Sequence, residues 1–243
     1  MNWMKTSRRE LVGCLTYLAL ATRPDISFAA SYLGQFNNSY GKAHWIAAKR
    51  VLRYLKGTLD LGLAYSPDAK PLKGYVDSDW GNCPDDRRSY SGYVFAFNGS
   101  PISWDARKQR TVALSSTEAE YMALTEGAKE SIHWTAILNE LGFEELTDIK
   151  VFSDNFGALR LADNPVFHAR SKHIAIRHHF IREVLKDKRL RVERISTDDN
   201  VADMFTKSIP KPKFEKCIAL SGMKQTAALQ QESSVLSSKG SVG

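Results

Sequence analysis

Four carboxylates recur at points where an α/β fold would bring them together. Asp77 lies in the apolar-flanked run of residues 75–80, and Asp154 ends a second apolar run. Glu120 lies near the start of a long helical pattern, and Asp203 lies in the last one. Acidic residues are poor strand formers, so Asp77 in a strand indicates a functional role. Because ligand groups favour the carboxyl ends of strands in open α/β sheets, we expect these four side chains to converge there.

Four converging carboxylates are best suited to binding metal ions. Their like charges repel strongly unless divalent cations neutralise them. Oxygen ligands without histidine or cysteine select Mg²⁺ or Mn²⁺. Two such ions about 4 Å apart are a common device for phosphodiester cleavage, in which one activates water and the other holds the leaving oxygen. Taken alone, however, Asp154 is more typical of a helix cap and Asp203 of a solvated helix residue.

Helix geometry decides which glutamate would be the ligand. Glu118 and Glu120 lie about 200° apart around a helix, so they cannot share a face. We predict Glu120 as the ligand and Glu118 as a first-turn charge that complements the helix dipole. The face of Glu120 continues with small or apolar residues, which are Ala123, Leu124, Gly127 and Ala128. The face of Glu118 continues with residues that predict a wetter surface, which are Tyr121, Met122, Thr125 and Glu126.

Apolar periodicity and turn signals predict the elements that would position these acids. Asn98-Gly99 is a hairpin signal, and Ser115 with Glu118 is a capping-box signal for the helix that Gly142 ends. The predicted strands lie within residues 62–79 (two strands around a proline-containing turn), 91–98, 102–104, 149–154 and 190–195, and the helices at 115–141, 156–162, 171–188 and 200–207. This order predicts an α/β fold with a mixed five-stranded sheet flanked by helices, whose later strands pair in parallel through crossovers.

A small helical segment is predicted to precede the sheet. Its third helix runs from about residue 42 to 57 and has an apolar stripe that is expected to face a core: Trp45, Ala48, Leu52 and Leu55. A second stripe about a quarter turn away is basic and would suit contact with a nucleic-acid backbone: Lys42, Lys49, Arg53 and Lys56. The alternative is that the aliphatic stems of these side chains cover the edge of the core.

The composition narrows the class of protein. The chain has 243 residues, of which 43% are apolar and 25% charged, as in ordinary globular proteins. Residues 1–60 hold nine Lys/Arg and three Asp/Glu and so carry +6 of the net charge of +7, which fits polyanion binding or a solvated basic face. No apolar run is long enough to span a membrane, so no membrane partner is expected. Three distant cysteines and no clear signal peptide favour an intracellular, reducing compartment.

Five sequence blocks, in the right order, carry a family resemblance. They are Tyr-Val-Asp-Ser-Asp-Trp at 75–80, Asp-Arg-Arg-Ser-Tyr-Ser-Gly-Tyr-Val-Phe at 86–95, Ser-Ser-Thr-Glu-Ala-Glu-Tyr at 115–121, residues 172–183, and Ala-Asp-Met-Phe-Thr-Lys at 202–207. Together they resemble the ribonuclease H domain of copia-type LTR retrotransposon Pol polyproteins. Residues 8–57 resemble the end of the preceding reverse transcriptase, through residues 21–26 and 49–57.

The resemblance implies a ribonuclease H-like sheet and a hydrolase that nicks the RNA strand of RNA–DNA hybrids during reverse transcription. The family's four metal-binding acids map onto Asp77, Glu120, Asp154 and Asp203, with two Mg²⁺ or Mn²⁺ ions as cofactors. The implied partners are the RNA–DNA hybrid and the reverse transcriptase portion of the parent polyprotein, in a cytoplasmic particle or the nucleus. The expected domains are a helical reverse transcriptase tail (1–60), a ribonuclease H-like domain (61–222) and a disordered tail (223–243).

The chain departs from the family pattern in two ways. Many cellular ribonucleases H carry a loop histidine before the last acid, but residues 196–199 here read Ser-Thr-Asp-Asp. His173, His178 and His179 are expected to be structural or to contact the nucleic-acid backbone, because no acid is spaced to orient them. The polymerase's paired-aspartate motif is absent, so no DNA synthesis is expected, and the chain reads as a truncated copy.

Two further interpretations are open from the sequence. A catalytically silent nucleic-acid-binding remnant would keep the basic segment but lack the polymerase that holds the substrate. An integrase or transposase of the same fold is disfavoured, because its glutamate usually comes third and late in the chain, whereas Glu120 comes second.

Overall fold

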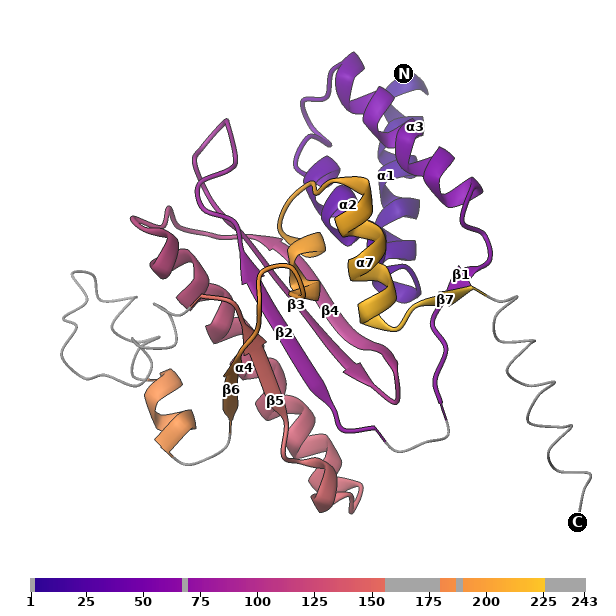
Figure 1. The fold of residues 1–243 in the computed structure, drawn as a ribbon. Coiled ribbons are helices and arrows are strands. Elements are labelled where there is room, and N and C mark those ends of the chain that lie inside the picture. Colours follow the sequence, from indigo (N-terminus) through magenta and orange to yellow (C-terminus); the bar gives the residue numbers. More distant parts are fainter. Residues whose placement is uncertain (1–2, 67–69, 156–179, 187–189, 226–243) are drawn as a thin grey trace, which may run out of the picture.

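Five of the six predicted strands form one mixed sheet. Figure 1 shows the computed structural model, which describes residues 3–66, 70–155, 180–186 and 190–225. The strand order is β4-β3-β2-β5-β6. The first three strands pair antiparallel and β2, β5 and β6 pair parallel, which confirms the predicted mixed sheet. The strand bounds are β2 Lys73–Ser78, β3 Tyr90–Phe97, β4 Ser100–Lys108, β5 Lys150–Ser153 and β6 Arg191–Arg194.

The turn between β3 and β4 is the hairpin that the sequence predicts. Asn98 and Gly99 connect the two strands, and both have positive φ, of 49° and 83°. Two-residue hairpin turns of this kind require positive φ at both positions, which asparagine and glycine tolerate best. The turn therefore fixes the register of β4 against β3.

Helix α4 (Ser116–Glu140) covers the sheet face to which Val76 points. A Cβ atom at Gly127 would lie 2.3 Å from Cγ1 of Val76, so only glycine lets the helix approach β2 this closely. Leu124 and Val151 are fully buried beside this contact and belong to the same core. The close approach sets the height at which the first turns of α4, including Glu120, lie against the sheet.

A short 3-10 helix, η3 (Val201–Phe205), packs on the opposite face of the sheet. Side chains alternate along a strand, so Asp77 points to the face that Val76 does not. Gly92 is the register partner of Asp77 on β3, and a Cβ atom there would lie 2.5 Å from Cβ of Phe205. The absence of a side chain at Gly92 thus lets η3 lie beside Asp77. Helix α7 (Lys211–Ser221) follows and packs against η3.

The N-terminal helices form a small bundle with its own core, which packs on the sheet (Figure 1). Asp25 accepts a hydrogen bond from Tyr54 Oη (2.6 Å) and forms a buried ion pair with Arg23 (2.7 Å). The indole Nε1 of Trp104 on β4 donates to the Ala19 carbonyl oxygen (2.7 Å) and so joins the bundle to the sheet. The helices are α1 Trp3–Ala21, η1 Pro24–Ile26, α2 Ser27–Gly34 and α3 Lys42–Lys56.

Two local predictions are wrong. Leu52 was expected in the core stripe of α3, but it is 41% exposed, whereas Ala48 and Leu55 are buried. A helix on the surface of a small bundle buries only a narrow stripe, and the partly buried Val51 takes the place of Leu52 in it. Residues 200–207 were expected to start the final helix, but η3 is a short 3-10 helix that ends at Phe205, and the final helix, α7, is a separate element.

Residues 223–225, at the start of the tail that was predicted to be disordered, are ordered. Met223 is buried, and β7 (Lys224–Gln225) pairs antiparallel with β1 (Leu61–Gly62), so cross-strand hydrogen bonds order this part of the tail. Two predicted segments, the rest of the tail (226–243) and the helix at 156–162, lie outside the described residues. The helix predicted at 171–188 is described only at 180–186, and these residues are helical. The division into domains at residue 60 stays a prediction. No helix within the described ranges has the length and apolarity needed to cross a membrane.

Candidate active site

Asp77 lies near the carboxyl end of β2, with its side chain almost completely buried. Thr206, which follows η3, donates a hydrogen bond from Oγ1 to Oδ2 of Asp77 (2.5 Å). The ammonium of Lys207 lies 3.3 Å from the same oxygen. The segment after η3 therefore holds this carboxylate in place from the face opposite α4.

Glu120 reaches the same end of the sheet from the first turns of α4. The helix begins as predicted, because Ser115 Oγ accepts from the backbone N–H of Glu118 (3.1 Å) and Glu118 Oε2 accepts from the N–H of Leu114 (2.9 Å). Glu120 is 8% exposed, and its buried Oε2 has no hydrogen-bond partner among the described residues.

The prediction of a wet face along Glu118 is wrong. Tyr121, Met122 and Thr125 are all buried. Ala113 in the loop before α4 packs with Ala119 and Met122, so the first turns of the helix are covered by this loop as well as by the sheet. Burial on several sides could not be read from a single helical face.

Asp154 directly follows β5 and is half-buried. The side-chain amide of Asn200 donates to the Val76 carbonyl oxygen (3.0 Å) and to Oδ1 of Asp154 (3.4 Å). The Oδ1 of Asn200 accepts from the N–H of Ala202 and so caps η3. Asn200 was not among the residues predicted for the site. An asparagine just before a helical stretch predicts a cap. It does not predict the hydrogen bonds to Val76 and Asp154, which join the start of η3 to β2 and to the end of β5.

The structure brings three of the four predicted acids together. One carboxylate oxygen from each of Asp77, Glu120 and Asp154 lies within 4.8 Å of the others. Hard oxygen ligands of this kind suit Mg²⁺ or Mn²⁺. The unpartnered Oε2 of Glu120 faces two further carboxylates, so a cation would both neutralise the cluster and satisfy this oxygen. The residues present therefore fit a divalent cation.

Asp203 lies beside Asp77 but has a different environment from the other three acids. Its carboxylate is fully buried and pairs with two lysines. Lys207 Nζ lies 2.5 Å from Oδ1, and the ammonium of Lys213 on α7 pairs with Oδ2. The sequence analysis did not predict either lysine. The only signal for Lys207 is its i+4 spacing from Asp203, and Lys213 has none, because α7 brings it back to η3.

The electrostatics separate Asp77 and Glu120 from Asp203. Burial raises the pKa of Asp77 to about 7, although Lys207 opposes the shift. Burial and then repulsion by Asp77 and Asp154 raise the pKa of Glu120 to about 10. Burial alone would raise the pKa of Asp203, but hydrogen bonds from Lys207 and Lys213 lower it below its usual range. The carboxyl group of Glu120 thus holds a proton near neutral pH unless a cation replaces it, that of Asp77 is partly protonated there, and Asp203 stays ionised.

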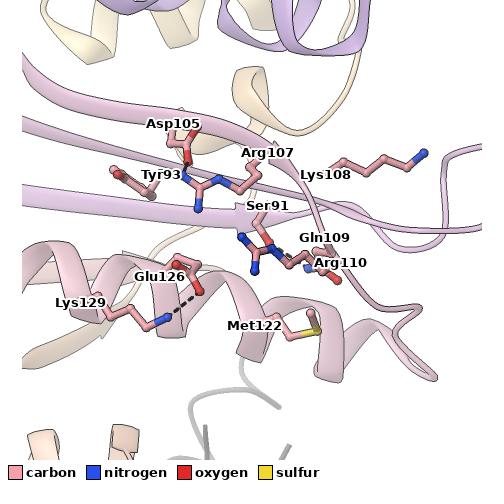
Figure 2. Close-up of a pocket in the computed structure, with 10 residues that line it drawn as sticks. All are labelled: Ser91, Tyr93, Asp105, Arg107, Lys108, Gln109, Arg110, Met122, Glu126 and Lys129. Carbon is pink, nitrogen blue, oxygen red and sulfur yellow. Dashed lines mark hydrogen bonds and ion pairs between the residues drawn. The ribbon is translucent and has the colours of Figure 1, made fainter. Parts of the chain in front are cut away.

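A hollow of about 260 Å³ lies between β3, β4 and α4 (Figure 2). Met122 of α4 lines it, whereas none of the four acids does. Arg107 and Lys129 line the hollow and pair with the acids Asp105 and Glu126 of its wall. Figure 2 shows the guanidinium of Arg110 at the same hollow, whereas Lys108 points away from it. The hollow is polar and carries more positive than negative charge.

The four residues of the predicted basic stripe are all exposed on α3: Lys42, Lys49, Arg53 and Lys56. They belong to the N-terminal bundle, not to the elements that carry the acids. Their contact with nucleic acid stays a prediction. The three histidines at 173, 178 and 179 lie outside the described residues. Residues 196–199 form an exposed turn, in which Ser196 donates a hydrogen bond to Asp199 (2.7 Å). Lys216 of α7 pairs with the same aspartate (2.7 Å).

Comparisons with known proteins give consistent relatives. No family model matches the chain. It is 45% identical over 222 residues to the retrovirus-related Pol polyprotein from transposon TNT 1-94 of Nicotiana tabacum, which covers 91% of this chain and 17% of that protein. It is 42% identical over 211 residues to the Pol polyprotein from transposon RE2 of Arabidopsis thaliana, which covers 86% of this chain and 14% of that protein. The chain thus spans about one sixth of the length of these curated relatives. Among solved structures, LC11-RNase H1 aligns with 56% of this chain and 92% of its own, with a TM-score of 0.43 and 15% identity.

Proposed function

Because the chain belongs to the family of copia-type Pol polyproteins of retrotransposons, we propose that it is a ribonuclease H-type nuclease. Its substrate would be the RNA–DNA hybrid of reverse transcription, and it would cleave the RNA strand. Two divalent cations, Mg²⁺ or Mn²⁺, would assist the hydrolysis. The observation that supports this proposal best is the cluster of Asp77, Glu120 and Asp154, which fits a divalent cation at the end of the sheet.

The residues of the cluster would have distinct roles. Asp77, Glu120 and Asp154 would hold a cation. Such a cation would lower the pKa of a bound water and offset the negative charge of the phosphate. Thr206 fixes the orientation of Asp77, and Asn200 that of Asp154, so that neither carboxylate has to reorganise when the substrate binds. Asp203 would complete the second cation site on the side of Asp77.

Binding of the hybrid would use charge and shape more than sequence. A-like duplexes are recognised through their backbones and 2′-hydroxyls. Arg107 and Arg110 line the hollow of Figure 2, where they would meet a backbone phosphate. The basic stripe on α3 would extend the contact to phosphates farther along the duplex.

The reverse transcriptase portion of the parent polyprotein is the second partner that we propose. Large apolar side chains on the N-terminal bundle are exposed, among them Tyr17 (72%) and Leu20 (66%) on α1 and Leu59 (82%) after α3. We propose that these three side chains belong to a surface that another protein part covers.

Cleavage of a strand-labelled RNA–DNA hybrid by the whole purified chain tests the proposed function. We expect fragments from the RNA strand only, in Mg²⁺ or Mn²⁺, and none in chelator. Duplex DNA of the same sequence is the control and should stay intact. Binding of the hybrid without cleavage in either metal would contradict the proposal and favour a silent nucleic-acid-binding remnant.

The salt dependence of binding tests the basic stripe. The double variant Lys49→Gln/Arg53→Gln should lower the slope of log affinity against log salt by about two units, because each lost phosphate contact removes about one released counterion. The measurement is hybrid binding in chelator over a salt series. Lys211→Gln/Lys216→Gln on α7 is the matched control for the loss of two charges. An equal change of slope in both variants would show that the stripe makes no specific contact.

A further inference from the structure

Lys207 occupies an unusual position between two of the four acids. Its ammonium lies 2.5 Å from Oδ1 of Asp203 and 3.3 Å from Oδ2 of Asp77. Both carboxylates are almost completely buried, whereas the lysine side chain is 31% exposed. The positive charge thus lies on the side of Asp77 that faces Asp203, and part of the lysine side chain is exposed to solvent.

Lys207 is not needed to neutralise Asp203. Lys213 on α7 already pairs with the other oxygen of that carboxylate, so Asp203 has two cationic partners for one negative charge. Asp77, by contrast, shares its cluster with Glu120 and Asp154, and Lys207 is the cation that contacts it there. The arrangement places a positive charge where Asp77 and Asp203 would otherwise offer oxygens to a divalent ion.

We propose that Lys207 is a built-in cation that competes with a divalent ion for the oxygens of Asp77 and Asp203. This inference rests on the proposed function, and it concerns the order in which the metal sites fill. The cluster of Asp77, Glu120 and Asp154 takes the first ion, because among the described residues Lys207 contacts only one of its three acids, Asp77. The second ion binds only when it displaces Lys207, whose exposed, flexible stem lets it turn toward solvent.

The proposal predicts that removal of Lys207 strengthens the binding of metal. A divalent ion within about 5 Å of an ammonium is repelled strongly even at the effective dielectric of a protein surface. In Lys207→Met the second ion should therefore bind at least about tenfold more tightly than in the unchanged chain. If Lys207 only supported the structure, its removal would disorder Asp77 and Asp203 and would weaken the binding of the second ion.

Calorimetric titration of the whole chain with Mn²⁺, without substrate, measures this directly. The unchanged chain and Lys207→Arg should show one tighter and one weaker ion, and Lys207→Met should show the second ion strengthened. Lys207→Gln is a second neutral variant that can still hydrogen-bond to Asp203 if Lys207→Met fails to fold, as judged by circular dichroism. Lys216→Met, which removes an exposed lysine paired with Asp199, controls for the net charge.

The outcomes separate this inference from the proposed function. Unchanged or weaker binding of the second ion in both neutral variants would overturn the role of Lys207 and leave the nuclease proposal intact. Equal strengthening in Lys216→Met would also overturn it, because the effect would then follow net charge alone. Failure of every chain to bind Mn²⁺ would overturn both.

Discussion

Asp154→Asn is expected to lower the rate of RNA-strand cleavage by about 10³-fold or more. The substitution keeps the shape of the side chain, and Asn200 can remain in contact with it, but the cluster loses one of its three negative charges. A cation that stabilises the transition state by several kcal/mol is then held poorly or misplaced. Single-turnover cleavage of a labelled hybrid measures the effect.

Binding separates this loss from a loss of fold. Asp154 is one residue among many that would meet the duplex, so Asp154→Asn should bind the hybrid in chelator within about twofold of the unchanged chain. Asp148→Asn is the matched control, because it makes the same change just before the other end of β5, where Asp148 pairs with Arg191 (2.9 Å). Cleavage by Asp154→Asn at the rate of the control would rule out the proposed site.

Glu120→Gln is expected to stabilise the metal-free chain while it abolishes cleavage. Folding raises the pKa of the Glu120 carboxyl from 4.5 to about 10. Between these values the folded chain keeps a proton that the unfolded chain has released, so the free energy of unfolding falls as the pH rises through this range. Glutamine carries no charge and can donate its amide hydrogens to the neighbouring carboxylates. At pH 8 in chelator we expect a gain of about 1–3 kcal/mol, or a rise in melting temperature of several degrees.

Divalent metal should reverse the order of stability. Mg²⁺ or Mn²⁺ binds the folded chain and replaces the protons of the cluster, so it should raise the melting temperature of the unchanged chain, increasingly so at higher pH. Glu120→Gln should respond weakly. Glu118→Gln is the matched control, because it weakens the hydrogen bond to the N–H of Leu114 and should lower the melting temperature by an amount that metal does not change. A lower melting temperature for Glu120→Gln in chelator at pH 8 would contradict the electrostatic account of the site.

The sequence was sufficient for the parts of the fold that depend on local signals. The Asn98-Gly99 turn, the cap at Ser115 and the strand that carries Asp77 are each specified by a few adjacent residues, and the structure contains all three. The convergence of Asp77, Glu120 and Asp154 was also predictable, because parallel strands place their carboxyl ends at one edge.

The contacts that orient the acids could not be predicted in the same way. Asn200 bonds to groups 46 and 124 positions away, and Lys213 reaches Asp203 only because α7 folds back on η3. Such contacts depend on tertiary packing, which no periodicity or spacing records. The exposed Leu52 has the same cause, since the width of a buried stripe depends on what the helix packs against.

The pairing of β1 with β7 joins residues that lie more than 160 positions apart, Leu61–Gly62 and Lys224–Gln225. On the predicted division at residue 60, the chain would therefore enter and leave the sheet-bearing unit at a single point on its surface. A unit with adjoining ends can be inserted into a longer polypeptide, or moved within it, without separating the flanking segments. A unit of residues 61–225 with this geometry could be gained or exchanged by a polyprotein as one block.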